Sequence, residues 1–234
     1  MAEGLFRIAA GAFKALVLGA ALGKMAEPIM GIETNVDGIA NFLRISVGGL
    51  WLSLFAYGFH IYLNFSGYSD IAIGLARLHG YTIMENFRWP YLATNIGDFW
   101  RRWHISLTGW VTDYVYIPLG GNRRGTRIAT INTFIAMILV GVWHGLSMHF
   151  VWWGAYQALL LVIYRQWRTH WHKKSKLRDI PGWRYMAWAL TFFFFNLGWV
   201  LFVLPLDPAI NVYLKLFGLQ YTGFTPELFT QHMQ

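Results

Sequence analysis

The stretch VGVWHGLSMHF, residues 140–150, lies at the centre of an apolar region that runs from residue 128 to residue 167. As a single helix this region would be about 60 Å long, roughly twice the thickness of the hydrocarbon core of a bilayer. We therefore expect it to fold back on itself, and Gly145-Leu146-Ser147 is the natural position for the turn. Such a hairpin places an imidazole, that of His144, at the end of a membrane helix.

Basic residues flank this hairpin on both sides and predict its orientation. Both basic loops lie on the same side of the membrane if the region is a hairpin, and that side is the cytoplasm. His144 is then expected far from the cytoplasmic surface. His104 neighbours Arg101 and Arg102 and is expected nearer to it, so that the two imidazoles lie at different depths. The basic residues are Arg123, Arg124 and Arg127 before the hairpin, and Arg165, Arg168, Lys173, Lys174, Lys176 and Arg178 after it.

The composition of the chain is that of a membrane protein. Of its 234 residues, 56% are hydrophobic and only 13% are charged, whereas soluble domains carry about 25% charged residues. Cysteine is absent, which excludes disulfides, thiolate metal sites and a cysteine nucleophile. The net charge of +8 is concentrated in loops between apolar segments, so we expect a lipid bilayer rather than nucleic acid as the partner.

The remaining segments predict an all-α, polytopic membrane protein that forms one membrane domain over residues 1–234. Residues 38–63 and 185–204 are apolar enough to span, and residues 64–81 predict a short, half-polar helix. Residues 84–99 predict a loop, and residues 99–119 a re-entrant or interfacial amphipathic helix. Near the N-terminus, Glu3 argues against a cleaved signal peptide, and Arg7 and Lys14 share one face, which predicts a helix with one wet stripe.

Two histidines are the main candidates for chemistry. An imidazole within a membrane usually faces a cavity or pairs with another polar group, so His144 indicates a functional site, with a structural hydrogen bond between helices as the alternative. Histidine is the usual general base near neutral pH. Gly145 removes a side chain beside this ring and could let a substrate approach. His104 lies in FWRRWHISL, where Trp100 and Arg102 are equally typical of an interfacial belt.

Other polar clusters give weaker signals. The segment NFSGYSD, residues 64–70, offers hydroxyls and the carboxylate of Asp70, and a structural network is a better interpretation than a Ser-His-Asp triad. His144 and His149 are five residues apart, which is off the spacing of one helical face, so we expect no metal site. The GGNRRG segment is typical of a turn, although its arginines could meet the phosphates of a cytoplasmic donor.

Four blocks of sequence, taken together and in this order, resemble one protein family. They are NFSGYSDIAIGLARLHGY, ENFRWPYL, DFWRRWHISLTGWVTDYVYIPLGGNRRG and VGVWHGLSMHFVWWGAYQA. The family is the bacterial membrane-bound O-acyltransferase family, most closely its alginate O-acetylation branch. The resemblance extends from about residue 4 to about residue 220 and includes FNLGWVLFVLPLDPAINVYLKLFG. Asn64 stands where the family often has an acid, which argues against a required charge at this position.

This resemblance implies an enzyme of the bacterial inner membrane that transfers an acetyl group from a cytoplasmic thioester donor to a hydroxyl of an extracytoplasmic polysaccharide. No bound cofactor is implied, whereas a periplasmic acetyltransferase partner is. Family members are longer, so the chain would correspond to the catalytic middle and later part of the enzyme, without the upstream helices. By this resemblance His144 is the catalytic histidine and His104 the second one.

We expect the substrates to be held by aromatic and polar residues that shape a dry tunnel and by arginines that attract the donor phosphates. These residues are Trp143, Trp103, Asn64, Ser66, Tyr68, Ser69, Asp70, Arg101, Arg102, Arg123 and Arg124. Two alternatives stay open at this point. One is transfer of D-alanyl or another acyl group to teichoic-acid-like polymers, and the other is a non-catalytic membrane channel or assembly subunit in which the histidines are structural.

Overall fold

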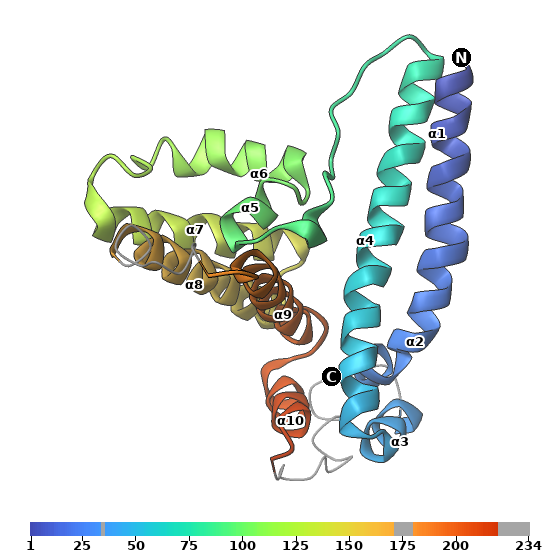
Figure 1. Ribbon diagram of the computed structural model, residues 1–234, viewed down its shortest axis with the longest axis vertical. Coiled ribbons are helices and arrows are strands. Elements are labelled where there is room, and N and C mark those ends of the chain that lie inside the picture. Colours follow the sequence, from blue (N-terminus) through green and yellow to red (C-terminus); the bar gives the residue numbers. More distant parts are fainter. Residues whose placement is uncertain (34–35, 171–179, 220–234) are drawn as a thin grey trace. The chain divides into compact units, whose positions relative to one another are not determined.

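The computed structural model describes residues 1–33, 36–170 and 180–219, and all regular secondary structure in these ranges is helical (Figure 1). The chain divides into two compact units, Met1–His79 with Trp199–Gln234, and Gly80–Gly198. The prediction of an all-α polytopic membrane fold is confirmed, whereas a single membrane domain over residues 1–234 stays a prediction. Lys173, Lys174, Lys176 and Arg178 fall outside the described residues.

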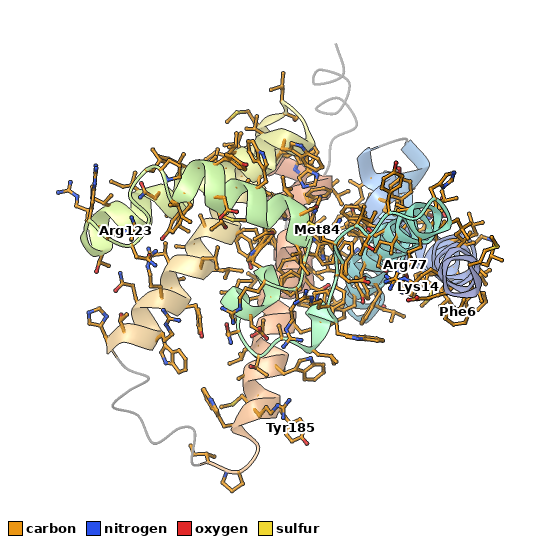
Figure 2. All side chains as sticks on the ribbon, turned by 90° about the horizontal axis from the view of Figure 1, so that it is seen from above. Phe6, Lys14, Arg77, Met84, Arg123 and Tyr185 are labelled. Atoms are coloured by element: carbon orange, nitrogen blue, oxygen red, sulfur yellow. The ribbon has the colours of Figure 1, made fainter. Side chains whose placement is uncertain are left out.

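The first unit begins with one continuous helix, which is long and apolar enough to cross a membrane. It consists of α1 (Ala2–Ala12), the π-helical segment η1 (Phe13–Gly19) and α2 (Ala20–Met30). α1 packs along α4, and Figure 2 shows Lys14 and Arg77 where these two helices lie side by side. The predicted wet stripe is wrong, because Arg7 and Lys14 both donate to the Asp70 carboxylate on α4, each at 2.6 Å.

α4 (Val47–Leu78) corrects two predicted boundaries. The span predicted for residues 38–63 is divided between α3 (Val36–Arg44) and α4, and the half-polar helix predicted for residues 64–81 is the second half of α4. The break occurs at Ser46, whose extended backbone and side chain cap α4 by accepting from the Gly49 N–H at 3.1 Å. A hydropathy pattern cannot detect this cap inside an apolar run.

α10 (Leu206–Leu216) completes the first unit by packing against the start of α4. The Trp51 indole donates to the Leu216 carbonyl at 3.0 Å. The buried Lys215 ammonium donates to the carbonyls of Phe42 and Leu43 and lies 4.6 Å from the centroid of the Phe42 ring. These contacts satisfy a cation that would otherwise be costly among apolar groups, and burial lowers the pKa of Lys215.

The second unit is built on the predicted hairpin. α7 (Gly125–His144) and α8 (Met148–His170) are joined by residues 145–147, as expected from the length of the apolar region. Two glycines allow the helices to approach closely, because a Cβ at Gly141 would overlap the Phe150 carbonyl and a Cβ at Gly154 would overlap the Met137 carbonyl. Small residues at such contacts are typical of membrane helix pairs.

The remaining elements of the second unit contact this hairpin or one another. They are η3 (Pro90–Leu92), α5 (Ile96–Trp100), α6 (Ile105–Val111), the π-helical η4 (Thr112–Tyr116) and α9 (Trp183–Val203). The loop predicted for residues 84–99 is confirmed in part, since η3 and the first four of the five residues of α5 are helical. Aromatic rings form the contact between α5 and α9. The Phe99 ring lies 3.6 Å from the Phe195 ring and 5.5 Å from the Trp103 ring, measured between centroids. α9 ends just before Pro205, as predicted.

Candidate active site

His144 is the last residue of α7 and is surrounded by aromatic rings. Its ring centroid lies 5.0 Å from that of Trp143, 5.5 Å from that of Trp153 and 5.9 Å from that of Phe150. Arg124 directly precedes the first residue of α7, so His144 lies at the end of the helix opposite the basic turn, as expected. The ring is partly exposed rather than sealed in the core.

The space beside Gly145 is filled by a side chain, whereas an opening for a substrate was expected. A Cβ at this position would lie 2.7 Å from a carbon of the Phe150 ring. The missing side chain therefore makes room for Phe150, which packs over the His144 imidazole, and it does not open a path for a substrate. Gly145 is required for aromatic packing at the tip of the hairpin.

His104 is buried and lies directly before α6 in the left-handed region, with φ of 45°. Its Nδ1 lies 3.4 Å from the Ser106 hydroxyl, which itself donates to the Asn86 side-chain oxygen at 3.0 Å. The Ile105 N–H donates to the Asn86 carbonyl at 3.0 Å, so the loop before α5 fixes this unusual turn. A non-glycine residue keeps such a backbone only where its surroundings impose it, which is common at functional sites.

The two histidines share Trp143 as a neighbour. The His104 ring centroid lies 5.5 Å from that of Trp143, in an edge-to-face arrangement. Trp143 therefore lies beside both imidazoles, and their separation in depth across the membrane stays a prediction. The left-handed turn at His104 separates the preceding arginines from α6.

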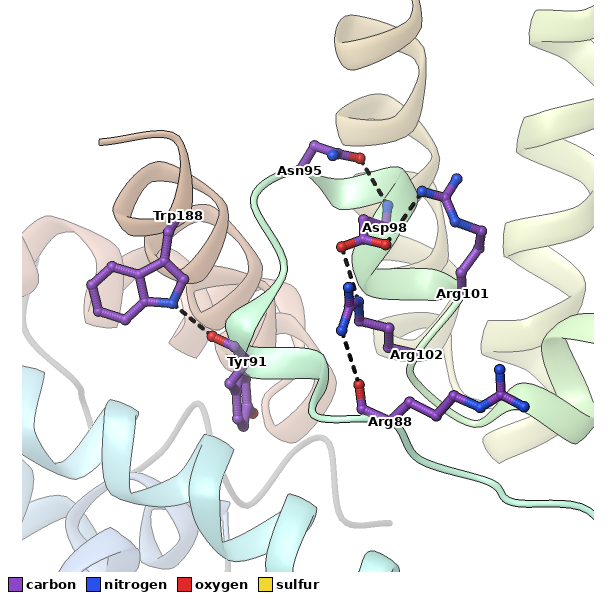
Figure 3. A network of polar contacts seen from close by, with 7 residues as sticks. All are labelled: Arg88, Tyr91, Asn95, Asp98, Arg101, Arg102 and Trp188. Atoms are coloured by element: carbon purple, nitrogen blue, oxygen red, sulfur yellow. Dashed lines mark hydrogen bonds and ion pairs between the residues drawn. The ribbon is translucent and has the colours of Figure 1, made fainter. Parts of the chain in front are cut away.

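Those arginines belong to a polar network around α5 (Figure 3). The Asp98 carboxylate accepts from Arg101 at 3.3 Å and from Arg102 at 2.9 Å. Arg102 also donates to the Arg88 carbonyl at 3.3 Å, whereas the Arg101 side chain is 69% exposed. Arg102 therefore holds the loop that contains Arg88, whereas the Arg101 side chain is accessible to a ligand.

A cavity of about 310 Å³ lies within the second unit, between α5, α6, η4, α7 and α8. Its α7 wall consists of Thr133, Ala136, Met137 and Val140, which share one helical face. His144 continues this face one turn beyond Val140, about 6 Å along the axis. Trp100, which lines the cavity, packs against Trp153, and Trp153 packs against His144. His144 itself does not line the cavity, and the indoles of Trp100 and Trp153 lie between the cavity and the His144 imidazole.

The opposite part of the cavity is cationic. Arg101, Arg165 and Arg168 line it, together with Tyr116 and Asn122. Arg165 donates to the hydroxyls of Thr130 and Thr133 at 2.9 Å and 3.1 Å, which fixes its guanidinium against α7. Sequence reasoning assigned Arg165 and Arg168 only a topological role. The signal that could have identified them is their spacing with Leu161 and Tyr164, which places all four on one face of α8.

Several predicted substrate residues lie elsewhere. Arg102, Arg123, Arg124, Trp103 and Trp143 do not line this cavity. Trp103 lies in the aromatic core, 5.2 Å from Phe87 between ring centroids, which explains its burial. Arg123 lies in the turn before α7 and is labelled in Figure 2. Substrate contacts by these five residues stay a prediction.

The predicted segment 64–70 lies on α4 in the first unit. Asn64 and Tyr68 are exposed, whereas Ser66, Ser69 and Asp70 are buried. The Ser66 hydroxyl donates to the Leu63 carbonyl at 3.5 Å, and Asp70 accepts from Arg7 and Lys14. These contacts match the structural network favoured for this segment, and substrate binding by the five residues stays a prediction. Within the part of the chain that the structure describes, no three His, Cys, Asp or Glu residues cluster as metal ligands.

A pair of substitutions at His104 separates backbone from side-chain effects. His104→Asn is expected to preserve the fold, because asparagine tolerates left-handed backbone, whereas His104→Val is expected to destabilise it by about 1–2 kcal/mol. Thermal unfolding in detergent measures both. Equal stability of the two variants would show that the left-handed turn imposes no cost.

The same variants report the ionisation of His104, which lies outside the candidate membrane spans. Burial lowers the pKa of His104 from 6.5 to about 4. The unfolded state therefore binds the proton first as the pH falls, and the native protein loses stability between about pH 6.5 and about pH 4. His104→Asn is expected to reduce this loss, and an unchanged pH profile would contradict a buried, neutral imidazole.

The fold and the site together define a class of protein. It is a polytopic α-helical membrane protein with two neighbouring imidazoles beyond a cavity lined by arginines. The family model for the membrane-bound O-acyltransferases matches residues 1–206. The chain belongs to the membrane-bound O-acyltransferase family.

Relatives of known name extend this result. The chain is 38% identical over 201 residues to the "Probable alginate O-acetylase AlgI" of Pseudomonas fluorescens. The aligned region is 86% of this chain and 37% of the relative. It is 35% identical to the peptidoglycan O-acetyltransferase of Helicobacter pylori, over 94% of this chain and 39% of the relative. It is 31% identical to the teichoic acid D-alanyltransferase of Bacillus subtilis, over 77% of this chain and 48% of the relative. The chain thus spans less than half the length of these relatives.

Proposed function

We propose that the protein transfers an acetyl group from a cytoplasmic thioester donor to hydroxyls of an extracytoplasmic polysaccharide, directly or through a periplasmic relay protein. The observation that carries the proposal is the position of His144, which lies one helical turn beyond a cavity whose other part is lined by three arginines. The names of the relatives from Pseudomonas fluorescens and Helicobacter pylori support an acetyl group and a cell-surface polymer. The bacterial inner membrane is the corresponding location.

In this proposal the His144 imidazole acts as general base. It accepts the proton of the acceptor hydroxyl while the oxygen attacks the thioester carbonyl carbon. The new C–O bond forms, the C–S bond breaks, and the leaving thiolate receives the proton, so that the imidazole returns to its neutral form. Histidine suits this exchange because its ordinary pKa lies near neutral pH. His104 positions the donor or completes the proton path from the other side of Trp143.

The aromatic rings around His144 support the choice of a thioester. Trp143, Trp153 and Phe150 each lie within 6 Å of the imidazole between ring centroids. Trp153 and Phe150 cover part of the imidazole, and the less water reaches a bound ester, the less hydrolysis competes with transfer. At the cationic part of the cavity, the donor phosphates would contact Arg101, Arg165 and Arg168.

The function is tested by transfer of radiolabelled acetyl from a thioester donor in membranes that contain the protein. Label is expected in polysaccharide, or in a periplasmic protein isolated with it, and only when the donor is supplied on the cytoplasmic side. Transfer from either side at equal rate would contradict the proposed direction. A second candidate is D-alanyl transfer to a teichoic-acid-like polymer, which the Bacillus subtilis relative favours. Preference for a D-alanyl over an acetyl thioester would select it.

The neighbouring arginines Arg101 and Arg102 provide a matched test of donor binding. Both contact Asp98, but only Arg101 lines the cavity, and Arg102 also holds the Arg88 carbonyl. Arg101→Gln is expected to raise KM for the donor about tenfold with little change in kcat, since one charge-assisted contact is lost. Arg102→Gln is expected to lower thermal stability and leave KM unchanged. Equal effects of the two variants on KM would contradict this assignment.

A further inference from the structure

A second cavity, of about 490 Å³, lies between α8, α9 and the residues that begin α5. Its walls are one face of each long helix, with Leu160, Ile163 and Trp167 on α8 and Ala187, Leu190 and Phe194 on α9. Tyr164 lines both this cavity and the first one. The residues assigned to catalysis, His144 and His104, do not line this second cavity, which we call the α8–α9 groove.

The α8–α9 groove changes in polarity along its length. At the start of α9 it is lined by Trp183 and Arg184, and the Trp183 ring lies 6.0 Å from the Trp167 ring between centroids. Toward Phe194, about 16 Å further along the axis, the α9 wall is mostly apolar. Thr191 on α9 and Thr94 and Asn95 before α5 are the uncharged polar residues that also line the groove. A charged and aromatic end that continues into a mainly apolar groove matches the headgroup and acyl chain of a lipid.

The position of the polar end relative to the membrane supports this match. α9 is long and apolar enough to cross a bilayer, and tryptophans and tyrosines gather where membrane helices meet the headgroups. Trp183 and the 77%-exposed Tyr185 occupy the first turn of α9, and Figure 2 labels Tyr185 on this helix. Arg168, in the last turn of α8, is one of the basic residues after the hairpin that are expected to mark the cytoplasmic side.

The groove is also open at its side. Ile163, Leu190 and Phe194 are 55%, 47% and 45% exposed, although each lines the groove. Apolar side chains exposed on a membrane-spanning helix contact hydrocarbon, so a lipid chain can enter laterally. The Arg184 guanidinium adds charge complementarity, because it attracts an anionic phosphate and repels a headgroup that also carries an ammonium.

We propose that the α8–α9 groove binds an anionic phospholipid of the cytoplasmic leaflet. Its phosphate contacts Arg184 beside the paired indoles of Trp167 and Trp183, and one acyl chain lies along Leu190 and Phe194. This site is distinct from the acyl-transfer site and does not depend on the proposed reaction. A bound lipid would stabilise Tyr164, the residue shared by both cavities.

Native mass spectrometry of the detergent-solubilised protein tests the site. After incubation with phosphatidylglycerol or phosphatidylcholine, the wild type is expected to retain phosphatidylglycerol preferentially. Arg184→Gln is expected to reduce this preference about fivefold, the effect of one cation at the membrane surface. The matched control Arg123→Gln removes the same charge from the turn before α7 and is expected to leave retention unchanged.

Leu190→Trp, which fills the groove without altering its charge, is expected to reduce the retention of both lipids. Normal elution of each variant in size-exclusion chromatography shows that it is folded. Equal retention of the two lipids by the wild type would overturn the proposal, as would equal losses in Arg184→Gln and Arg123→Gln. A lipid-free dimer that Leu190→Trp dissociates would also overturn it, because a second copy of the chain would then occupy the groove.

Discussion

Replacing the catalytic candidate, His144→Ala, is expected to lower the rate of acyl transfer by about 10²–10⁴-fold, with the protein present in membranes at its normal level. The magnitude is that of a positioned general base. The substitution removes the imidazole from the end of α7 and keeps the helix, because alanine is the best helix former. The measurement is the initial rate of radiolabelled acetyl transfer, divided by the amount of protein in the membrane.

A matched control is available five residues further along the chain. His149 also lies at the tip of the hairpin, where its Nδ1 is 3.0 Å from the Ser147 hydroxyl. His149→Ala is expected to change the rate less than twofold. If His144→Ala folds and transfers at the wild-type rate, the catalytic assignment is wrong. If it reduces the amount of assembled protein and leaves turnover per molecule unchanged, the imidazole is structural, as in a channel or assembly subunit.

The hairpin that carries His144 could be predicted because its determinants are local. The apolar region is too long for one crossing, and a glycine and a serine lie at its centre. The result is a turn at residues 145–147, as expected. The position of His104 could not be predicted in this way. It depends on a left-handed turn and on backbone hydrogen bonds to Asn86, which residue spacing does not reveal.

The cationic part of the cavity was also only partly predictable. Arginines in loops are easy to recognise as candidates for phosphate binding, and Arg101 does line the cavity. Arg165 and Arg168, by contrast, lie at the end of an apolar helix, where basic residues usually mark the cytoplasmic surface. Which of several arginines faces a cavity depends on how α7 and α8 pack, and that packing is set by tertiary contacts at Gly141 and Gly154.

The polar segment on α4, residues 64–70, leads to a prediction about the stability of the protein. Asp70→Ala is expected to lower the free energy of unfolding by about 3 kcal/mol, because it leaves two cations without their shared anion at a helix contact. Arg7 Nη2 and Lys14 Nζ each lie 2.6 Å from one carboxylate oxygen, and only 12% of the Asp70 side chain is exposed. Unfolding in detergent with increasing denaturant, followed by circular dichroism, measures the change.

Close contact of the two helices explains why this carboxylate reaches both cations. Gly11 lies between Arg7 and Lys14 in sequence, and a Cβ there would overlap the Gly67 carbonyl, three residues before Asp70. The helices therefore cannot separate at this point without losing both ion pairs. Glu3 and Arg77 form a further pair near the helix ends, but Glu3 is 67% exposed, so this contact contributes little.

Compensating substitutions separate charge from packing at Asp70. Asp70→Asn keeps the shape of the side chain and removes its charge. It is therefore expected to lower the free energy of unfolding nearly as much as Asp70→Ala does. The triple variant Arg7→Gln, Lys14→Gln, Asp70→Asn removes all three charges and is expected to recover most of the loss, since neutral amides can hydrogen-bond in place of the ions. If the triple variant is no more stable than Asp70→Asn, the cost does not arise from the loss of the anion that the two cations share. If Asp70→Ala leaves stability unchanged but abolishes acyl transfer, the carboxylate acts on the substrate as the sequence suggested.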